Sequence, residues 1–265
     1  MELITKQGAI LSVPKGYKQT EVGLIPEDWS VEPIGDLASI STGGSDTQDR
    51  IDDGAYPFFV RSQTIERINK FSFDGEAILT SGDGVGVGKI FHYVNCKFDY
   101  HQRVYNIHNY RNDVTGKYLF FQFSTNFFDR VMAMTAKSSV DSVRREMIAD
   151  MQIPLPPTLT EQKAIATALS DVDALITSLE QTITKKKAIK QGAMQQLLTP
   201  PHKGGKRLPG FSGEWVEKTL GEVANYQNGK ALESYFNSSD GYKVVSIGNY
   251  SESGIYVDNN NFISK

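Results

Sequence analysis

The chain has 265 residues, of which 39% are hydrophobic and 11% aromatic, so it can bury the core of one large or two smaller domains and is not a disordered protein. Its single cysteine, Cys96, excludes an internal disulfide and fits a reducing compartment, so we expect a cytoplasmic protein. The net charge of −3 gives no general support for nucleic-acid binding, although a local basic face could still bind DNA.

The charge is unevenly distributed along the chain. Residues 17–157 carry 14 Lys+Arg against 19 Asp+Glu, whereas residues 160–207 carry 8 against 4. The longest apolar runs fall short of the roughly 20 residues of a membrane span, and the first residues lack the basic start and apolar run of a signal peptide. We therefore expect no membrane association.

Residues 1–16 are expected to form an N-terminal extension, and residues 17–157 a globular domain. Short apolar and aromatic runs separated by Gly and Asp predict strands, and apolar residues at helical spacing predict helices. The predicted strands are 56–61, 77–81, 89–94 and 103–107; the predicted helices are 118–134 and 144–150, followed by extended residues 151–157. This mixture indicates an α+β domain.

The glycine-rich segment 82–89 suggests a phosphate-binding loop but does not match one. In a phosphate-binding loop, a first glycine precedes a Gly-Lys pair, and a Ser or Thr that binds magnesium follows the pair. When Gly88 and Lys89 are aligned with that pair, Asp83 occupies the position of the first glycine and Ile90 that of the Ser or Thr. The segment also lies between two predicted strands and opens no helix, unlike a dinucleotide-binding loop. We interpret it as a glycine turn; the alternatives are a loop close to a DNA backbone, with Lys89 on a phosphate, and a small phosphate-binding enzyme.

The sequence contains no recognisable catalytic constellation. His101 has no second His or Cys at zinc spacing, so a packed or surface histidine is the simpler interpretation. No Gly-x-Ser-x-Gly nucleophile motif is present. Residues 155–158 lack the Asp or Asn and the aromatic that an amino-methyltransferase needs around its Pro-Pro pair. The sequence therefore favours a binding protein over an enzyme.

A long helix is predicted over residues 158–199. Pro156 and Pro157 end the preceding segment, and Thr158 with Glu161 forms a capping-box pattern. A helix of about 40 residues is about 60 Å long. Apolar residues recur in steps of four and three, the spacing of a coiled-coil seam, at Ile165, Leu169, Val172, Ile176, Leu179 and Ile183 and again at Leu197. The seam is interrupted at Lys186 and Lys190. We predict that it pairs with an outside partner; a core helix of one compact domain is the alternative.

The sequence after the helix repeats a segment that precedes it. The segment from Trp29 to Gly43 matches the segment from Trp215 to Gly229 at a constant offset of 186, and the same offset carries 56–60 onto 242–246. The repeat predicts the incomplete start of a second globular domain at 208–265, and the Pro, Gly and basic residues of 200–207 predict a flexible linker before it.

Four segments together resemble one family, the DNA specificity subunits of type I restriction–modification systems. Residues 17–29 resemble the entry of a target-recognition domain, and residues 153–165 its junction with a spacer helix. Residues 191–198 resemble the end of that helix, and residues 208–215 the entry of the second recognition domain. These four segments span most of the chain, but the chain is shorter than the subunits that it resembles.

The resemblance implies two inverted recognition domains that each read a short half-site, separated by two antiparallel helices that set the gap. It implies no cofactor on this chain, because methyltransferase subunits supply the chemistry and bind S-adenosylmethionine, and nuclease subunits join for cleavage. The expected partners are double-stranded DNA, those subunits and a second copy of the chain paired through the helix. The alternative is a truncated scaffold or regulatory protein that binds methyltransferase subunits without reading DNA.

Base-contacting residues cannot be carried over from the family, so the candidates rest on local chemistry. We select polar and basic side chains of the predicted loops as candidates for DNA contact: Arg61, Lys89, His101, Gln102, Arg103, Lys137, Ser138, Ser139 and Arg144.

Overall fold

The computed structural model describes residues 3–4, 10–11, 13–134, 142–225, 227–229, 236–237, 241–246, 249, 255–257 and 262–263. The chain divides into two compact units, residues 1–184 and residues 185–265, and the boundary falls within the long helix. The first unit confirms the expected α+β class.

A six-stranded sheet forms the centre of the first unit. In spatial order it contains β6 (Ser39–Thr42), β11 (Val104–His108), β9 (Phe73–Ser81), β10 (Phe91–Tyr100), β7 (Tyr56–Phe59) and β8 (Glu66–Ile68). All neighbours are antiparallel except β10 and β7, where Tyr100 lies opposite Phe59 in a parallel pair. The Phe59 ring also lies 5.0 Å from the ring of His92, at the other end of β10. Both ends of β10 therefore approach β7, so the sheet is strongly curled.

Three two-stranded pairs accompany this sheet. They are β1 (Leu3–Ile4) with β2 (Ile10–Leu11), β3 (Tyr17–Thr20) with β4 (Gly23–Pro26), and β5 (Ser30–Pro33) with β12 (Gln152–Leu155). The β5–β12 pair joins the two ends of the globular domain. It places the chain at Leu155, immediately before the long helix, next to Ser30 near the domain entry.

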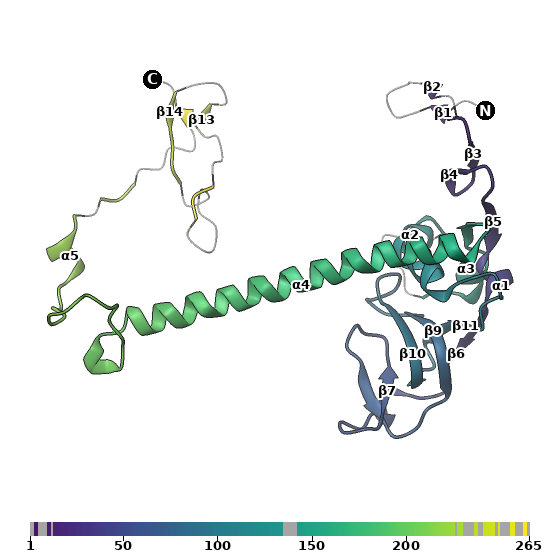
Figure 1. The fold of residues 1–265 in the computed structure, drawn as a ribbon, viewed down its shortest axis with the longest axis horizontal. Helices are drawn as coiled ribbons and strands as arrows, with labels where there is room; N and C mark the ends of the chain where they lie inside the picture. The colour runs from purple at the N-terminus through teal and green to yellow at the C-terminus, as the bar shows by residue number, and fades with distance from the viewer. Residues whose placement is uncertain are drawn as a thin grey trace. The chain divides into compact units, whose positions relative to one another are not determined.

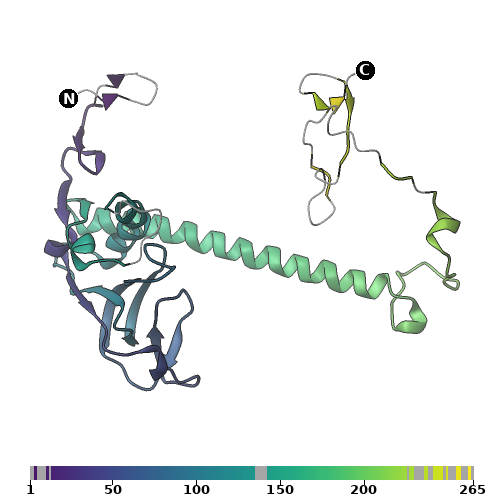
Figure 2. The same ribbon diagram turned by 180° about the vertical axis from the view of Figure 1, so that it is seen from behind.

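Helices cover one face of the sheet (Figures 1 and 2). They are α1 (Ile34–Leu37), α2 (Gly116–Met134) and α3 (Arg145–Ala149). Strand β9 shows how the faces divide: Ile78 packs into the core beneath the helices, whereas its neighbours Ala77 and Leu79 pack inside the curl with Phe59 and Phe98. The predicted strands and helices are confirmed, but β9 and β10 are longer than their apolar centres predict because polar residues continue both ladders.

The long helix α4 (Leu159–Leu197) starts on the first unit, as predicted. Its first turn is capped by the Thr158 hydroxyl, which accepts from the Glu161 amide at 3.2 Å. The Glu161 carboxylate does not complete the predicted capping box within the helix; it instead accepts from the indole nitrogen of Trp29 at 3.3 Å. The cap is thus shared between the helix and the domain entry.

Gln162 attaches the helix to the domain. Its side chain is fully buried. The side-chain nitrogen donates to the carbonyl oxygens of Asp113 at 2.8 Å and Pro156 at 3.2 Å. The side-chain oxygen accepts from the backbone amide of Thr115 at 2.9 Å. The next inward residue, Ala166, is also buried in the core. A buried amide with three backbone partners fixes how the helix leaves the domain.

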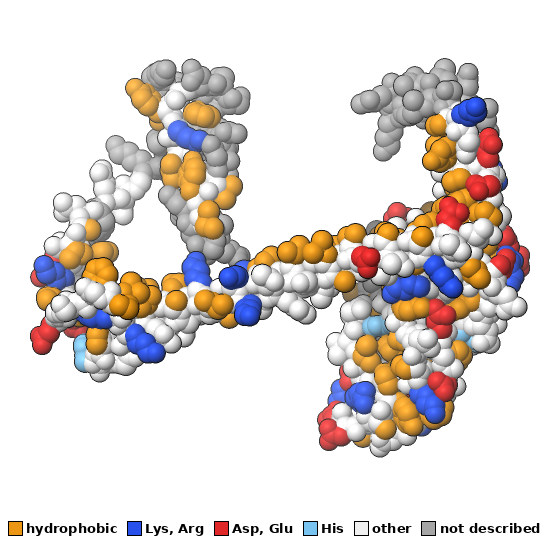
Figure 3. All heavy atoms as spheres, viewed as in Figure 1, with side chains coloured by type: hydrophobic (Ala, Val, Ile, Leu, Met, Phe, Trp, Pro, Cys, Tyr) orange, Lys and Arg blue, Asp and Glu red, His pale blue; other side chains and the backbone are white. Residues whose placement is uncertain are grey.

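Beyond this attachment, the predicted seam is uncovered among the residues that the structure describes. Ile165 still packs against the core, but the side chains after it are about half exposed, with fractions of 44% at Leu169, 54% at Val172 and 49% at Ile176. Leu179 and Ile183 continue the row, and Figure 3 shows hydrophobic side chains gathered along α4. The seam therefore presents an apolar stripe to solvent.

The second unit repeats local features of the first. Its helix α5 (Leu220–Val223) stands at the offset of 186 from α1, and the following alanines, Ala38 and Ala224, each donate to the first helical carbonyl at 2.9 Å. Strands β13 (Phe236–Asn237), β15 (Phe262–Ile263) and β14 (Tyr242–Lys243) form a small sheet in that order. Since β14 stands at the same offset from β7, the repeat is one of structure as well as sequence.

The linker predicted over residues 200–207 contains a hydrogen-bonded turn. The 3-10 turn η2 (Pro201–Lys203) folds back on the end of α4, where the Lys206 amide donates to the Gln196 carbonyl at 2.7 Å. At Gly205, a Cβ atom would lie 1.7 Å from the Thr199 carbonyl oxygen, so this close approach requires glycine. The linker is a hydrogen-bonded turn because its prolines and glycines fit one.

Replacing Gln162 with methionine tests the attachment. The variant fills a similar volume but removes the hydrogen bonds to the Asp113 and Pro156 carbonyls and to the Thr115 amide, which are buried or partly buried, so the free energy of unfolding should fall by about 2–4 kcal/mol in urea titrations. Gln181→Met, at an exposed position on the same helix, is the control and should stay within about 0.5 kcal/mol of the parent. Equal stabilities of the two variants would contradict the role given to Gln162.

Candidate nucleic-acid interface

Two of the candidate arginines meet at one carboxylate. Arg61 follows β7 and places a guanidinium nitrogen 2.8 Å from Asp83, while Nε of Arg103, just before β11, lies 3.8 Å from the other oxygen of Asp83. The side chains of Arg61 and Arg103 remain 44% and 65% exposed. Asp83 therefore holds two exposed cations side by side, which suits them to contact an anionic ligand such as a phosphate backbone.

Backbone hydrogen bonds join the loops that carry these residues. The Gly82 amide donates to the Arg103 carbonyl at 2.7 Å, and the Val143 amide donates to the Gly82 carbonyl, also at 2.7 Å. The Tyr105 hydroxyl then donates to the Val143 carbonyl at 3.2 Å. The glycine turn, the turn before β11 and the segment ahead of α3 are thus held together, although they are far apart in the sequence. We call this set of loops, residues 61–62, 82–89, 101–103 and 142–145, the loop rim.

The remaining candidates occupy different settings. Arg144 lies exposed at the N-terminus of α3 in the loop rim. Lys89 places its ammonium group 4.9 Å from the ring centre of Phe128 on α2, so it is turned toward that ring and not to Asp83. The predicted glycine turn is supported, because segment 82–89 joins β9 to β10. Lys137, Ser138 and Ser139 lie outside the described residues.

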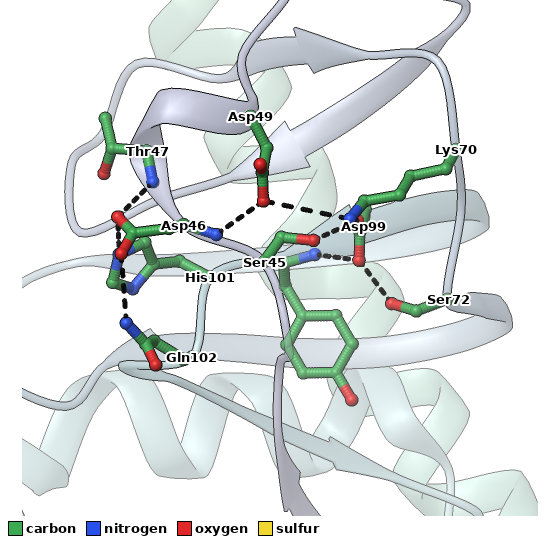
Figure 4. Close-up of polar contacts among 10 residues, drawn as sticks. Ser45, Asp46, Thr47, Asp49, Lys70, Ser72, Asp99, His101 and Gln102 are labelled. Atoms are coloured by element: carbon green, nitrogen blue, oxygen red, sulfur yellow. Dashed lines mark hydrogen bonds and ion pairs between the residues drawn. The ribbon is translucent and has the colours of Figure 1, made fainter.

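Polar contacts hold the turn at residues 101–103, and Figure 4 draws those that His101 and Gln102 make with Asp46. His101 is only 3% exposed; its Nδ1 accepts from the Arg103 amide at 2.9 Å, and its Nε2 lies 3.4 Å from Asp46. His101 is therefore buried in this structure, where its ring shapes the turn, and its DNA contact stays a prediction. Gln102, in contrast, is exposed and donates from its side-chain amide to Asp46 at 3.2 Å.

A buried carboxylate anchors the segments beside this turn. Asp99 is 1% exposed and accepts from the hydroxyls of Ser45 at 2.6 Å and Ser72 at 2.5 Å and from the Tyr100 amide at 3.0 Å. Lys70, whose side chain is 59% exposed, places its ammonium group 4.0 Å from the same carboxylate (Figure 4). The sequence patterns gave no signal for Asp46, Asp83 or Asp99, because the residues that give them a role are distant in the sequence.

His92 is a buried titratable residue that contacts the loop rim at Ser62. It is 8% exposed, and its Nε2 lies 3.2 Å from the Ser62 carbonyl oxygen, to which it can only donate. Burial of the imidazole lowers the pKa of His92, and the hydrogen bond to Ser62 opposes that effect. The contact helps fix the segment that carries Arg61.

Metal binding and membrane insertion find no support in the described residues. This part of the chain contains no group of three or more His, Cys, Asp and Glu arranged to hold a metal ion. None of the described helices is both long and apolar enough to cross a membrane.

Comparisons with known proteins agree with the resemblance seen in the sequence. The sequence model of the family described as type I restriction modification DNA specificity domain matches residues 26–191. The specificity subunit of the type I restriction enzyme EcoDI from Escherichia coli is 30% identical over 169 residues, covering 64% of this chain and 36% of that subunit. The MjaVIII specificity subunit from Methanocaldococcus jannaschii is 26% identical over 265 residues, covering 94% of this chain and 61% of that subunit.

The fold has a counterpart among solved structures. The crystal structure of a type I restriction–modification system S subunit from M. genitalium superposes with a TM-score of 0.54 and 17% identity, covering 96% of this chain and 64% of that one. The chain thus spans between about a third and two thirds of the length of these relatives.

The pKa shift of His92 predicts a pH dependence of stability. Because the folded-state pKa lies below the unfolded value of about 6.5, the unfolded state binds a proton first as the pH falls, so the folded state loses stability below about pH 6.5 by up to about 1.4 kcal/mol per pH unit. His92→Gln can still donate to Ser62 but does not titrate. Urea titrations between pH 7.5 and 5 should show a smaller loss in the variant than in the parent; identical losses would contradict the assignment.

Proposed function

We propose that this chain, which belongs to the type I restriction modification DNA specificity domain family, reads a short DNA half-site with its first unit and has no catalytic activity of its own. The observation that carries the proposal is the loop rim, where Arg61 and Arg103 are exposed beside the polar turn at Gln102. Basic groups that bind phosphates next to an amide that can read a base edge are the two components of sequence-specific DNA binding.

The overall acidity of the domain does not oppose this function. Affinity for DNA depends on the phosphates that are contacted, and the loop rim concentrates exposed cations at one place. Arg144 and Arg145 add two further exposed basic residues next to Val143, which is hydrogen-bonded to the glycine turn. Lys89, Lys137, Ser138 and Ser139 remain candidates for DNA contact on the local chemistry of their segments.

The proposed partners follow from the family. A methyltransferase subunit, which would bind S-adenosylmethionine, and a nuclease subunit would supply the chemistry that this chain lacks, and α4 would space the recognition unit from its counterpart. The attachment of α4 through Gln162 supports a spacer role, because a spacer must leave the domain in a fixed direction.

The exposed seam supports pairing of two copies through α4. Burying an aliphatic side chain is worth roughly 1.5–3 kcal/mol, so an uncovered row from Leu169 to Ile183 favours association. A two-fold axis would pair two such helices antiparallel and place the recognition units in inverted orientation. In that arrangement Lys186 and Lys190 would face the opposite end of the partner helix, where Asp171 is exposed, so lysine would not face lysine.

Binding of duplex DNA in the presence of a cognate methyltransferase subunit tests the function. The double variant Arg61→Ala/Arg103→Ala should weaken binding to all sequences and reduce the slope of log affinity against log salt by about one unit for each phosphate that is no longer bound. Lys218→Ala, an exposed lysine of the second unit, is the control and should change neither quantity. An unchanged salt slope in the double variant would show that the loop rim is not the DNA-binding surface.

Association through the seam has its own test. Ile176→Asp places a charge in the centre of the stripe and should convert dimers to monomers, measured as a halving of mass by light scattering at micromolar concentration. Ser178→Asp adds the same charge at an exposed polar position of the helix and should leave the dimer intact. A parent chain that is monomeric both alone and with its methyltransferase subunit would contradict the pairing.

A further inference from the structure

We propose that Gln102 reads an adenine in the major groove and that Asp46 is the residue that positions it. This inference rests on the proposed function, because it assigns a base to one residue of the loop rim. Four features support it: the backbone of the turn, the orientation of the amide, its match to adenine and the cations beside it.

The backbone at Gln102 is fixed from both sides. The Gln102 amide donates to the Ser45 carbonyl at 2.9 Å, and the His101 amide donates to the Phe59 carbonyl at 2.9 Å. The hydroxyl of Ser45 is in turn held by the buried Asp99. The turn is thus built onto the sheet through β7 and β10, so its exposed side chain starts from a rigid position.

Asp46 fixes which way the side-chain amide points. A carboxylate only accepts hydrogen bonds, so the group of Gln102 that faces Asp46 at 3.2 Å must be the NH₂ group. Asp46 is itself held in the capping box of the 3-10 turn η1 (Thr47–Asp49), where it accepts from the Thr47 amide and its own amide donates to Asp49 (Figure 4). Holding a glutamine side chain in advance reduces the entropy cost of ordering it on a ligand.

The groups that remain free on Gln102 match adenine. When Asp46 takes the N–H that points away from the amide oxygen, the amide keeps its other N–H and its oxygen, which form a donor and an acceptor next to each other. Adenine presents the complementary pair in the major groove, the N7 acceptor and the N6 donor. Guanine presents two acceptors at N7 and O6, so one of them would face the amide oxygen. The geometry therefore distinguishes A·T from G·C at one position.

Cations beside the turn can hold the DNA backbone. Arg103 is the next residue and is 65% exposed, and Lys70 lies beside Asp99 and is 59% exposed. Lys70 also lies 3.8 Å from Asp49, the last residue of the turn that carries Asp46. A base-reading amide placed next to exposed cations is the arrangement that sequence-specific contacts require.

The test measures specificity separately from affinity. With the full chain and its methyltransferase subunit, competition between duplexes that differ at single positions gives the preference at each base pair and the affinity for unrelated DNA. Gln102→Ala should reduce the preference for A·T at one position of the half-site by about 5- to 150-fold while leaving the affinity for unrelated DNA unchanged. Asp46→Ala should reduce the same preference, whereas Asp46→Asn, which keeps an acceptor and a good helix cap, should restore most of it.

Gln48→Ala is the matched control. Gln48 is exposed in η1 and its side chain makes no hydrogen bond among the described residues, so its loss should alter no base preference. Thermal unfolding identifies variants that lose structure. If Gln102→Ala folds and leaves every base preference unchanged, Gln102 is not the reader. If Asp46→Ala folds and changes no preference, or changes a different position, Asp46 does not position it. A parent complex that binds all duplexes equally would instead overturn the proposed function itself.

Discussion

The structure depends first on the fixed attachment of α4 to the globular domain. A long helix with an apolar stripe is useful as a spacer only if its direction is set, and one buried side chain, Gln162, sets it by bonding backbone on two loops. Trp29 adds a second contact to the first turn through Glu161. Because the β5–β12 pair brings the entry and the exit of the domain together, residues from both ends of the domain hold the start of α4.

The loop rim shows a second constraint, the placing of like charges side by side. Two arginines would repel each other without a carboxylate between them, and Asp83 supplies it near the start of the glycine turn. The same turn accepts and donates backbone hydrogen bonds that join three loops. Two of its glycines, Gly84 and Gly88, have positive φ angles of 84° and 69°, whereas Gly82 is required by close packing of backbone. At Gly82, a Cβ atom would lie 2.8 Å from the Arg103 carbonyl oxygen.

The two copies of the repeat bury the same apolar pattern to different extents. In the first unit, Ile34 and Leu37 of α1 are fully buried beneath α2 and α3. At the same offset of 186, Leu220 and Val223 of α5 are 69% and 61% exposed, although the helix and its C-terminal hydrogen bond are the same. Local capping and turn residues thus suffice to form the helix, whereas burial of its apolar face depends on other elements of the fold.

The sequence by itself determined the periodic and local features: the long helix with its seam, the strands around 77–81 and 103–107, and the repeat. These follow from spacing and capping, which act over a few residues. It did not predict β6 or β5, whose polar residues become strands only because β11 and β12 pair with them. It selected Arg61, Gln102 and Arg103 but not the carboxylates that position them. Only the tertiary structure decided that His101 is buried and Gln102 exposed, because the partners that fix the turn are brought to it by the curl of the sheet.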